Sequence, residues 1–200
     1  MEKKKRIVKA VLDESGRLGI TAMGLVDMPA IEENWIALSK MQLAKVDKER
    51  RMIYGAALIP DREILRIDES GNEYYLVFDR ATIMQIAHQL FKKNLQHNTN
   101  LQHTMPVQGV TVVESWIKEG KHDKSIELGL NDLPDGTWFI GSKVDSDDVW
   151  ENEVKAGKVK GYSIEGFFNE VAVDLSGVMN YEAELMLELE QLLSSVKPSK

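Results

Sequence analysis

"RIVKAVLDESGRLGITAMGLV", residues 6–26, sets the fold class. Two apolar runs, "RIVKAVL" and "LGITAMGLV", have the length and the β-branched content that are typical of strands. The segment between them contains Ser15 and Gly16, which are common turn residues. The stretch therefore predicts a β-hairpin at the start of an antiparallel sheet.

Strand-like runs continue along most of the chain. They lie at 52–60, at 107–117, at 125–130, on both sides of the turn at 68–72, and after Gly136 up to 144. A last such stretch, "KGYSIEGFFNEVAV", covers residues 160–173. Many short strands with few helices predict an α+β fold that is mainly β, with a curved or barrel-like antiparallel sheet surrounded by a few helices.

Helical periodicity appears in three places. Apolar residues recur at helical spacing after Asp79, which can serve as the N-cap, up to Lys93. A short helix is expected between Ser146, as its N-cap, and Gly157, which ends it. The segment 179–200 contains an amphipathic helix with a frayed end. We therefore divide the chain into a main domain, residues 1–178, and a C-terminal helix and tail, residues 179–200.

Composition excludes several classes of protein. The 200 residues carry a formal net charge of −7, which argues against a nucleic-acid partner because phosphate contacts need clustered Lys and Arg. No segment of the sequence approaches the roughly 20 apolar residues that span a bilayer, so no membrane association is expected. The chain contains no cysteine, which suits a reducing cytoplasm. Any nucleophile must therefore be an oxygen.

The stretch "NLQHNTNLQHT", residues 94–104, places two histidines six positions apart. His97 and His103 are candidates for a metal clamp, for a catalytic base with a similar neighbour, or for two polar loop residues. A zinc site would need His122 and a carboxylate to converge with them, and no spacing such as HExxH supports this. We expect neither a metal nor an organic cofactor.

Ser163 lies between Gly161 and Gly166 in a strand context, where small neighbours let a substrate approach the backbone. A serine hydroxyl is a weak nucleophile unless a base takes its proton, so a histidine would have to meet Ser163 in the fold. The spacing is not that of the GxSxG nucleophile elbow. Spacing alone therefore leaves open whether Ser163 is catalytic.

Five motifs in order resemble one family. They are "LVDMPAIEENW", "LQHT", "VTVVESWI", "GTWFIGSKV" and "DDVWENEVKAGKVKGYSIEGFF", and they extend over roughly residues 20–173. This set is similar to the prohead maturation proteases of tailed bacteriophages, in particular the XkdF-like phage serine proteases. The resemblance implies a fold like that of the herpesvirus assemblins, with a serine nucleophile and a histidine base on strands or at their ends.

The resemblance also assigns site residues. The base falls on His103, which precedes the "VTVVESWI" strand, and the nucleophile falls on Ser163. Glu114 is the expected third member, and Glu165 and Asp174 compete with it. In strict alternation Glu114 shares a face with Val110 and Val112, so that a buried carboxylate there would need a charged partner. The assemblins use a histidine after the serine, which this sequence lacks. Backbone N–H groups near Gly157 and Gly161 are candidate oxyanion donors.

The resemblance further implies a function. It predicts a serine endopeptidase that cleaves scaffold and capsid-protein extensions, and itself, during prohead maturation. Such a protein would work in the bacterial cytoplasm inside the assembling procapsid, as a homo-oligomer, either a dimer or higher. The alternative is a catalytically inactive capsid-assembly or scaffold-binding module of the same fold.

Overall fold

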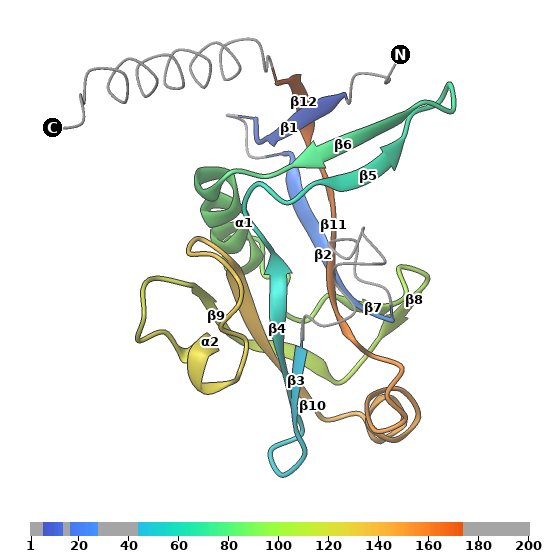
Figure 1. Cartoon of the computed structure of the whole chain (residues 1–200). Coiled ribbons are helices and arrows are strands. Elements are labelled where there is room, and N and C mark those ends of the chain that lie inside the picture. The colour runs from blue at the N-terminus through green and yellow to red at the C-terminus, as the bar shows by residue number, and fades with distance from the viewer. Residues whose placement is uncertain (1–5, 14–16, 28–43, 174–200) are drawn as a thin grey trace, which may run out of the picture.

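The computed structural model describes residues 6–13, 17–27 and 44–173. Within these ranges the protein is mainly β, and its strands form three four-stranded sheets (Figure 1). The expected C-terminal helix, 179–200, and the last part of the expected main domain lie outside the described residues. No helix in the described ranges is long and apolar enough to span a bilayer.

The first sheet has the order β12-β1-β6-β5 and lies at the upper end of the molecule in Figure 1. Its strands are β1 (Ile7–Val11), β5 (Ile64–Ile67), β6 (Glu73–Val77) and β12 (Asn169–Ala172). The hairpin predicted around residues 68–72 is present between β5 and β6. Asp68 fixes its turn, because Oδ1 accepts hydrogen bonds from the backbone N–H groups of Ser70 and Asn72.

The second sheet has the order β3-β4-β10-β9. It consists of β3 (Ala44–Asp47), β4 (Met52–Leu58), β9 (Val110–Ile117) and β10 (Trp138–Val144). All seven residues of β4 are buried, as a continuous apolar run predicts for a strand covered on both faces. This sheet carries the centre of the core.

The third sheet has the order β11-β2-β7-β8. It consists of β2 (Gly19–Val26), β7 (Thr99–Leu101), β8 (Met105–Val107) and β11 (Gly161–Phe167). Its contact with the second sheet includes the buried Tyr162, whose hydroxyl donates a hydrogen bond to the Ile53 carbonyl at 2.9 Å. Burial raises the pKa of the Tyr162 hydroxyl. The tyrosine side of β11 therefore belongs to the core.

The hairpin predicted for residues 6–26 is wrong. β1 and β2 do not pair with each other; both pair with the strand pair β11–β12, in the same direction. Val11 lies opposite Asn169 and Gly19 opposite Phe167, so the chain leaves the strand at residue 12 and resumes it at residue 19 without reversing. β1 and β2 therefore run in the same direction along one long partner instead of forming a hairpin.

The expected α+β, mainly β class is confirmed, but the strands form three sheets in place of one curved or barrel-like antiparallel sheet. In the part of the chain that the structure describes, no sheet closes on itself. Two strand pairs, β1 with β6 and β2 with β7, are parallel. Parallel neighbours need a crossover connection between them, and here the intervening chain contributes strands to the other sheets.

Two helix predictions are confirmed. Helix α1 (Arg80–Lys92) begins at Asp79, whose carboxylate accepts the Thr82 N–H at 2.7 Å, and it buries Ile83, Ile86 and Leu90 in the core. Ser146 caps α3 (Asp147–Val149), which continues into a π-helical turn, η1 (Trp150–Val154). Gly157 follows with a φ of +72°, which favours glycine.

The strand expected at 125–130 is instead the short helix α2 (Lys124–Glu127). Asp123 caps it by accepting the Ser125 N–H at 2.8 Å, and this local bond holds the first turn.

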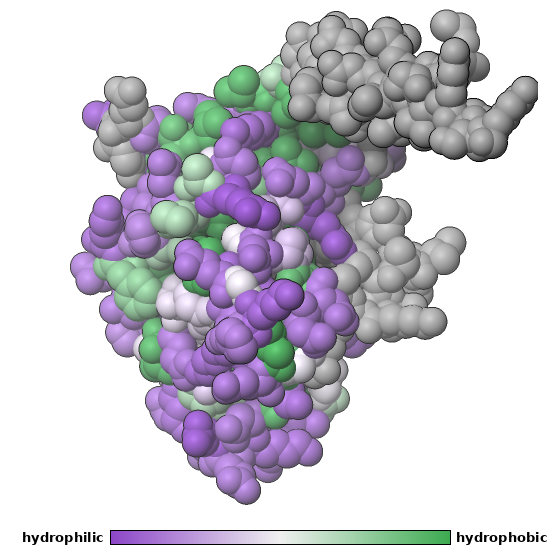
Figure 2. All heavy atoms as spheres, turned by 60° about the vertical axis from the view of Figure 1, so that its left-hand side comes forward, coloured by the Kyte–Doolittle hydropathy of each residue, from purple (hydrophilic) through white to green (hydrophobic). Residues whose placement is uncertain are grey.

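The hydropathy of the surface is uneven. Figure 2 shows a largely hydrophilic face whose apolar residues gather toward the end of the molecule that carries β1, β6 and β12.

Candidate functional site

Ser163 lies in the middle of β11, on the side of the strand that faces away from the core. Side chains alternate along a strand, and Tyr162 and Ile164 pack toward the core. Ser163 and Glu165 therefore share the opposite face. Ser163 is 6% exposed. The sequence predicted this strand correctly, and the strand brings a hydroxyl and a carboxylate to one surface.

Ser163, Gly24 and Asn100 form one row across three neighbouring strands. Ser163 on β11 lies opposite Gly24 on β2, and Gly24 lies beside Asn100 on β7. A Cβ atom on Gly24 would lie 2.8 Å from Cε1 of His103, 3.2 Å from its Nδ1 and 3.3 Å from Oδ1 of Asn100. The imidazole thus lies against the backbone of Gly24, in space that any other residue would fill.

His103 occupies the tip of the β7–β8 hairpin. Gln102 and His103 have φ values of +51° and +57°, and Thr104 N–H donates to the Leu101 carbonyl at 3.0 Å. Two successive positive φ values are characteristic of a type I′ turn, in which glycine and asparagine are preferred. Holding non-glycine residues there costs about 1–2 kcal/mol each. This backbone conformation folds the imidazole back over the sheet.

Asn100 connects the backbone of His103 to the carboxylate of Glu165. Its Oδ1 accepts the His103 N–H at 3.1 Å, and its Nδ2 donates to Glu165 Oε1 at 2.7 Å. Asn100 is 7% exposed. Both ends of a buried amide are therefore satisfied, and the turn and the carboxylate are fixed relative to each other.

Glu165 Oε1 also contacts Nδ1 of His103 at 2.9 Å. An ionised carboxylate only accepts hydrogen bonds, so Nδ1 carries the hydrogen of this contact. In a neutral imidazole the other ring nitrogen, Nε2, then has a free lone pair and can take a proton. His103 and Glu165 have side chains 38% and 35% exposed, so the pair is reachable from solvent.

The register places the serine and the imidazole on the same face of the sheet. Directly opposite residues of an antiparallel pair have Cβ positions about 4.5–5.5 Å apart, on the same face. The His103 ring lies against the Cβ position of Gly24, which is the residue opposite Ser163. An alcohol, an imidazole and a carboxylate therefore lie together on one face, the groups that nucleophilic catalysis by serine requires.

Glu114, the expected third member, lies in another sheet and contacts other groups. Its carboxylate accepts a hydrogen bond from the Tyr54 hydroxyl at 3.0 Å and forms an ion pair with Lys124. Burial, together with the Glu114 carboxylate, raises the pKa of Tyr54. The carboxylate that His103 contacts is Glu165, one of the two competitors.

A β-bulge explains the position of Glu114. Val112 pairs with Ser142, but Glu114 pairs with the adjacent Gly141, so Val113 is an extra residue in β9. A bulge of one residue reverses the alternation of side chains. Strict alternation predicted that Glu114 shares the face of Val110 and Val112. Because of the bulge, Glu114 lies on the opposite face of β9.

The stretch expected to donate to an oxyanion is used within the fold. The N–H groups of Gly157, Lys158, Val159 and Lys160 all donate to backbone carbonyls; the acceptors are Val154 for the first, Glu153 for the next two and Val26 for the last. These four N–H groups therefore close the end of the helical turn and hold the chain where it continues into β11.

His97 does not join His103. Its Nδ1 lies 3.1 Å from the Thr111 hydroxyl, near the start of β9. Across the residues that the structure describes, no three His, Asp or Glu side chains form a group that could hold a metal ion. Asp174, the other competitor for the third position, lies outside the described residues.

Sequence analysis missed Asn100 and Gly24. A glycine inside a strand often marks a place where another group comes close, and "AMGLV" contains such a glycine. Asn100 precedes His103 by three residues, the spacing at which an asparagine side chain can accept from a turn N–H. Their common role depends on the pairing of β2 with β7, which neither motif specifies.

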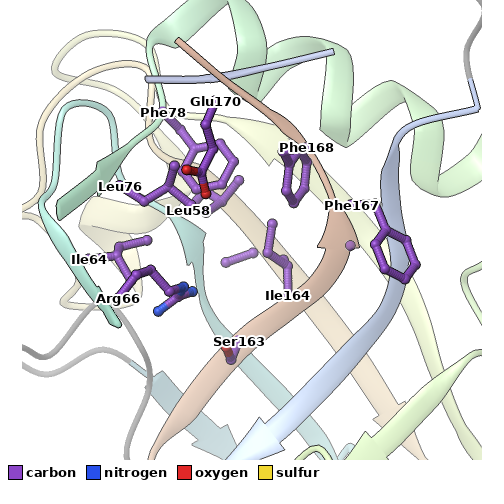
Figure 3. Close-up of a pocket in the computed structure, with 12 residues that line it drawn as sticks. Leu58, Ile64, Arg66, Leu76, Phe78, Ser163, Ile164, Phe167, Phe168 and Glu170 are labelled. Atoms are coloured by element: carbon purple, nitrogen blue, oxygen red, sulfur yellow. The ribbon is translucent and has the colours of Figure 1, made fainter. Parts of the chain in front are cut away.

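A pocket of about 270 Å³ adjoins Ser163 on the other side of β11. Figure 3 shows Ile164 near its middle, with Ser163 at one end and Glu170 at the other. Apolar side chains from β4, β5, β6 and the β11–β12 region form most of its wall: Leu58, Ile64, Leu76, Phe78, Ile164 and Phe168. Arg66 and Glu170 add one charge of each sign.

The family model described as "Putative phage serine protease XkdF" matches residues 40–172, well over half of the chain. The matched range includes His103, Asn100, Ser163 and Glu165. Comparisons with curated proteins and with solved structures found no significant match.

Proposed function

The chain belongs to the XkdF family of phage serine proteases, and from this premise we propose that it is a serine endopeptidase with Ser163 as nucleophile and His103 as base. Glu165 takes the role of the carboxylate that orients the imidazole. The observation that carries this assignment is the 2.9 Å contact of Glu165 Oε1 with His103 Nδ1, on the face of the sheet that holds Ser163.

The reaction follows from these positions. Nε2 of His103 takes the proton of Ser163 as Oγ attacks the scissile carbonyl carbon, and the resulting imidazolium is stabilised by Glu165. The proton then passes to the leaving amine nitrogen as the C–N bond breaks, which leaves an acyl ester on Ser163. Water, deprotonated by the same imidazole, attacks the ester carbon; the C–Oγ bond then breaks, Oγ takes the proton from the imidazolium, and the acid is released. His103 and Ser163 end in their starting states.

We further propose that the substrates are phage scaffold and capsid-protein extensions, and the chain itself, during prohead maturation. The family name supports a phage context and a protease role. Assembly as a homo-oligomer inside a procapsid in the bacterial cytoplasm, and a fold of the herpesvirus assemblin type, belong to the same proposal. The mainly β architecture is consistent with that fold.

Co-expression with the scaffold and capsid proteins of a phage that carries this chain tests the proposal. The expected result is truncation of these proteins by the wild type, measured by intact mass, and full-length proteins with Ser163→Ala and with His103→Ala. Truncation that persists in both variants would contradict the assignment. Capsid assembly without truncation by the wild type would favour the alternative, a catalytically inactive assembly module.

His97→Ala is the matched control. His97 and His103 follow the same Leu-Gln pair, but the ring of His97 contacts Thr111 and lies apart from the Ser163 row. Processing is expected to be unchanged by His97→Ala. Equal losses in both histidine variants would indicate a structural effect of the hairpin and refute the assignment of His103 as the base.

A further inference from the structure

We infer that the pocket beside Ser163 is a substrate subsite, which takes one large apolar side chain from a polypeptide strand bound along the edge of β11 that pairs with no other strand among the described residues. The inference rests on the proposed function, because it uses Ser163 as the reacting residue. It adds the way in which the substrate is held and the class of side chain that is selected.

The edge of β11 provides the place for the substrate strand. In the described ranges β11 is the first strand of its sheet and pairs with β2 on one side. The second half of β4, residues 56–58, lies on the opposite side of the pocket from β11. These residues extend beyond the part of β4, residues 52–55, that pairs with β3. Unpaired strand edges bind extended peptides through main-chain hydrogen bonds, with alternate side chains entering pockets.

The alternation of side chains connects the pocket to the reaction. A substrate residue opposite Ser163 would be on the face of His103 and Glu165. Its neighbour along the substrate would be opposite Ile164, whose side chain lies in the pocket (Figure 3). The pocket would therefore receive a side chain within two residues of the scissile bond.

The wall of the pocket selects by apolar contact rather than by charge. The two charged residues at the pocket have opposite signs and already have partners in the protein. Arg66 Nη1 donates to the Leu65 carbonyl at 2.9 Å, and Glu170 Oε1 accepts from the Tyr74 hydroxyl at 2.7 Å. A volume of about 270 Å³ lies below the roughly 300–1,000 Å³ of sites for drug-sized ligands, which suits a single side chain.

The first experiment measures specificity. The wild type is incubated with a proteome-derived peptide library, and the cleaved bonds are identified by mass spectrometry. Leu, Ile, Met or Phe is expected to be enriched at one position within two residues of the cleaved bond. Ile164→Trp, which fills the pocket, should reduce cleavage at those sites by about tenfold or more, since burying one such side chain is worth at least that factor.

Two variants complete the set. Ile164→Ala, which widens the pocket, should shift the preference from Leu toward Phe. Val113→Trp is the matched control, because Val113 is 51% exposed on β9 in another sheet and receives the same bulk there. The inference is overturned if no position near the cleaved bond favours apolar residues, or if Ile164→Trp and Ile164→Ala cleave with the wild-type profile.

Binding in the absence of cleavage separates the inference from the proposed function. The probes are two labelled dodecapeptides of Ser and Thr that differ in one central residue, Leu or Ser, and the protein is the Ser163→Ala variant. The Leu peptide is expected to bind about tenfold more tightly, and the added Ile164→Trp should abolish this difference. If the wild type cleaves proteins but the peptides bind equally, the inference alone fails. If the difference is found but the wild type cleaves nothing, the proposed reaction alone fails.

Discussion

Gly24→Ala places a methyl group under the imidazole of His103. The new Cβ would be 2.8 Å from Cε1, whereas carbon atoms in contact are about 3.5–4.0 Å apart. The ring must therefore move by at least about 0.7 Å, the difference between 2.8 Å and the lower contact limit. A displacement of that size directed away from Glu165 would lengthen the 2.9 Å Nδ1–Oε1 contact beyond the range of a hydrogen bond.

The expected loss is in activity more than in stability. A misplacement of about 1 Å costs on the order of 100-fold in rate, so kcat/KM for cleavage of a peptide substrate should fall by about 10–100-fold. Overpacking costs about 1–3 kcal/mol, and the residue that replaces glycine in a strand recovers about 0.5–1 kcal/mol of it. We therefore expect the free energy of unfolding to fall by no more than about 2.5 kcal/mol.

Gly141→Ala is the control for a general packing defect. A Cβ on Gly141 would lie 2.7 Å from Cε1 of Tyr54, a clash of the same severity in another sheet. This variant should lose stability and keep the kcat/KM of its folded fraction. Full activity of Gly24→Ala, or an equal loss of kcat/KM in both variants, would refute the reasoning.

Three further predictions concern single side chains. Glu165→Gln should lower kcat/KM by at least about 100-fold with little change in melting temperature, because Gln cannot stabilise the imidazolium; a stopped-assay rate within threefold of wild type would count against it. Asn100→Ala should lower the free energy of unfolding by about 1–3 kcal/mol in urea titrations. In ¹⁵N NMR spectra of the Ser163→Ala protein, the same change should broaden the Nδ1 signal of His103, which a loss of packing alone does not predict. Burial alone would raise the pKa of Asp79, but hydrogen bonds from Lys9 and Thr82 hold it below its ordinary value. Its charge therefore stabilises the fold above the unfolded pKa of about 4, and this stabilisation is lost as pH falls below that value. The melting temperatures of wild type and Asp79→Asn should therefore converge as pH falls from about 5 to about 2.

Local signals in the sequence located most elements. The continuous apolar run of β4, the cap and period of α1, and the strand around Ser163 are all properties of neighbouring residues, and they agree with the structure. The short helix α2 was missed because its first turn depends on one capping bond from Asp123.

Pairing between distant strands was the part that the sequence could not supply. Turn residues between β1 and β2 indicated a reversal, but both strands pair with one long partner, β11 and β12, near the other end of the described residues, and this partner holds them in line. The bulge at Val113 moved Glu114 to the other face of β9. The grouping of His103 with Glu165 and Asn100 depends on the same long-range pairing, so residue types alone could name Glu165 only as a competitor.

Covalent labelling tests whether His103 activates the hydroxyl of Ser163. A fluorophosphonate reacts with a serine whose hydroxyl is deprotonated by a neighbouring base, and the site of the adduct is read by mass spectrometry of the digested protein. We expect one adduct, on Ser163, that is absent from His103→Ala and retained in His97→Ala. Labelling at another serine, or labelling of Ser163 at an equal rate without His103, would contradict it.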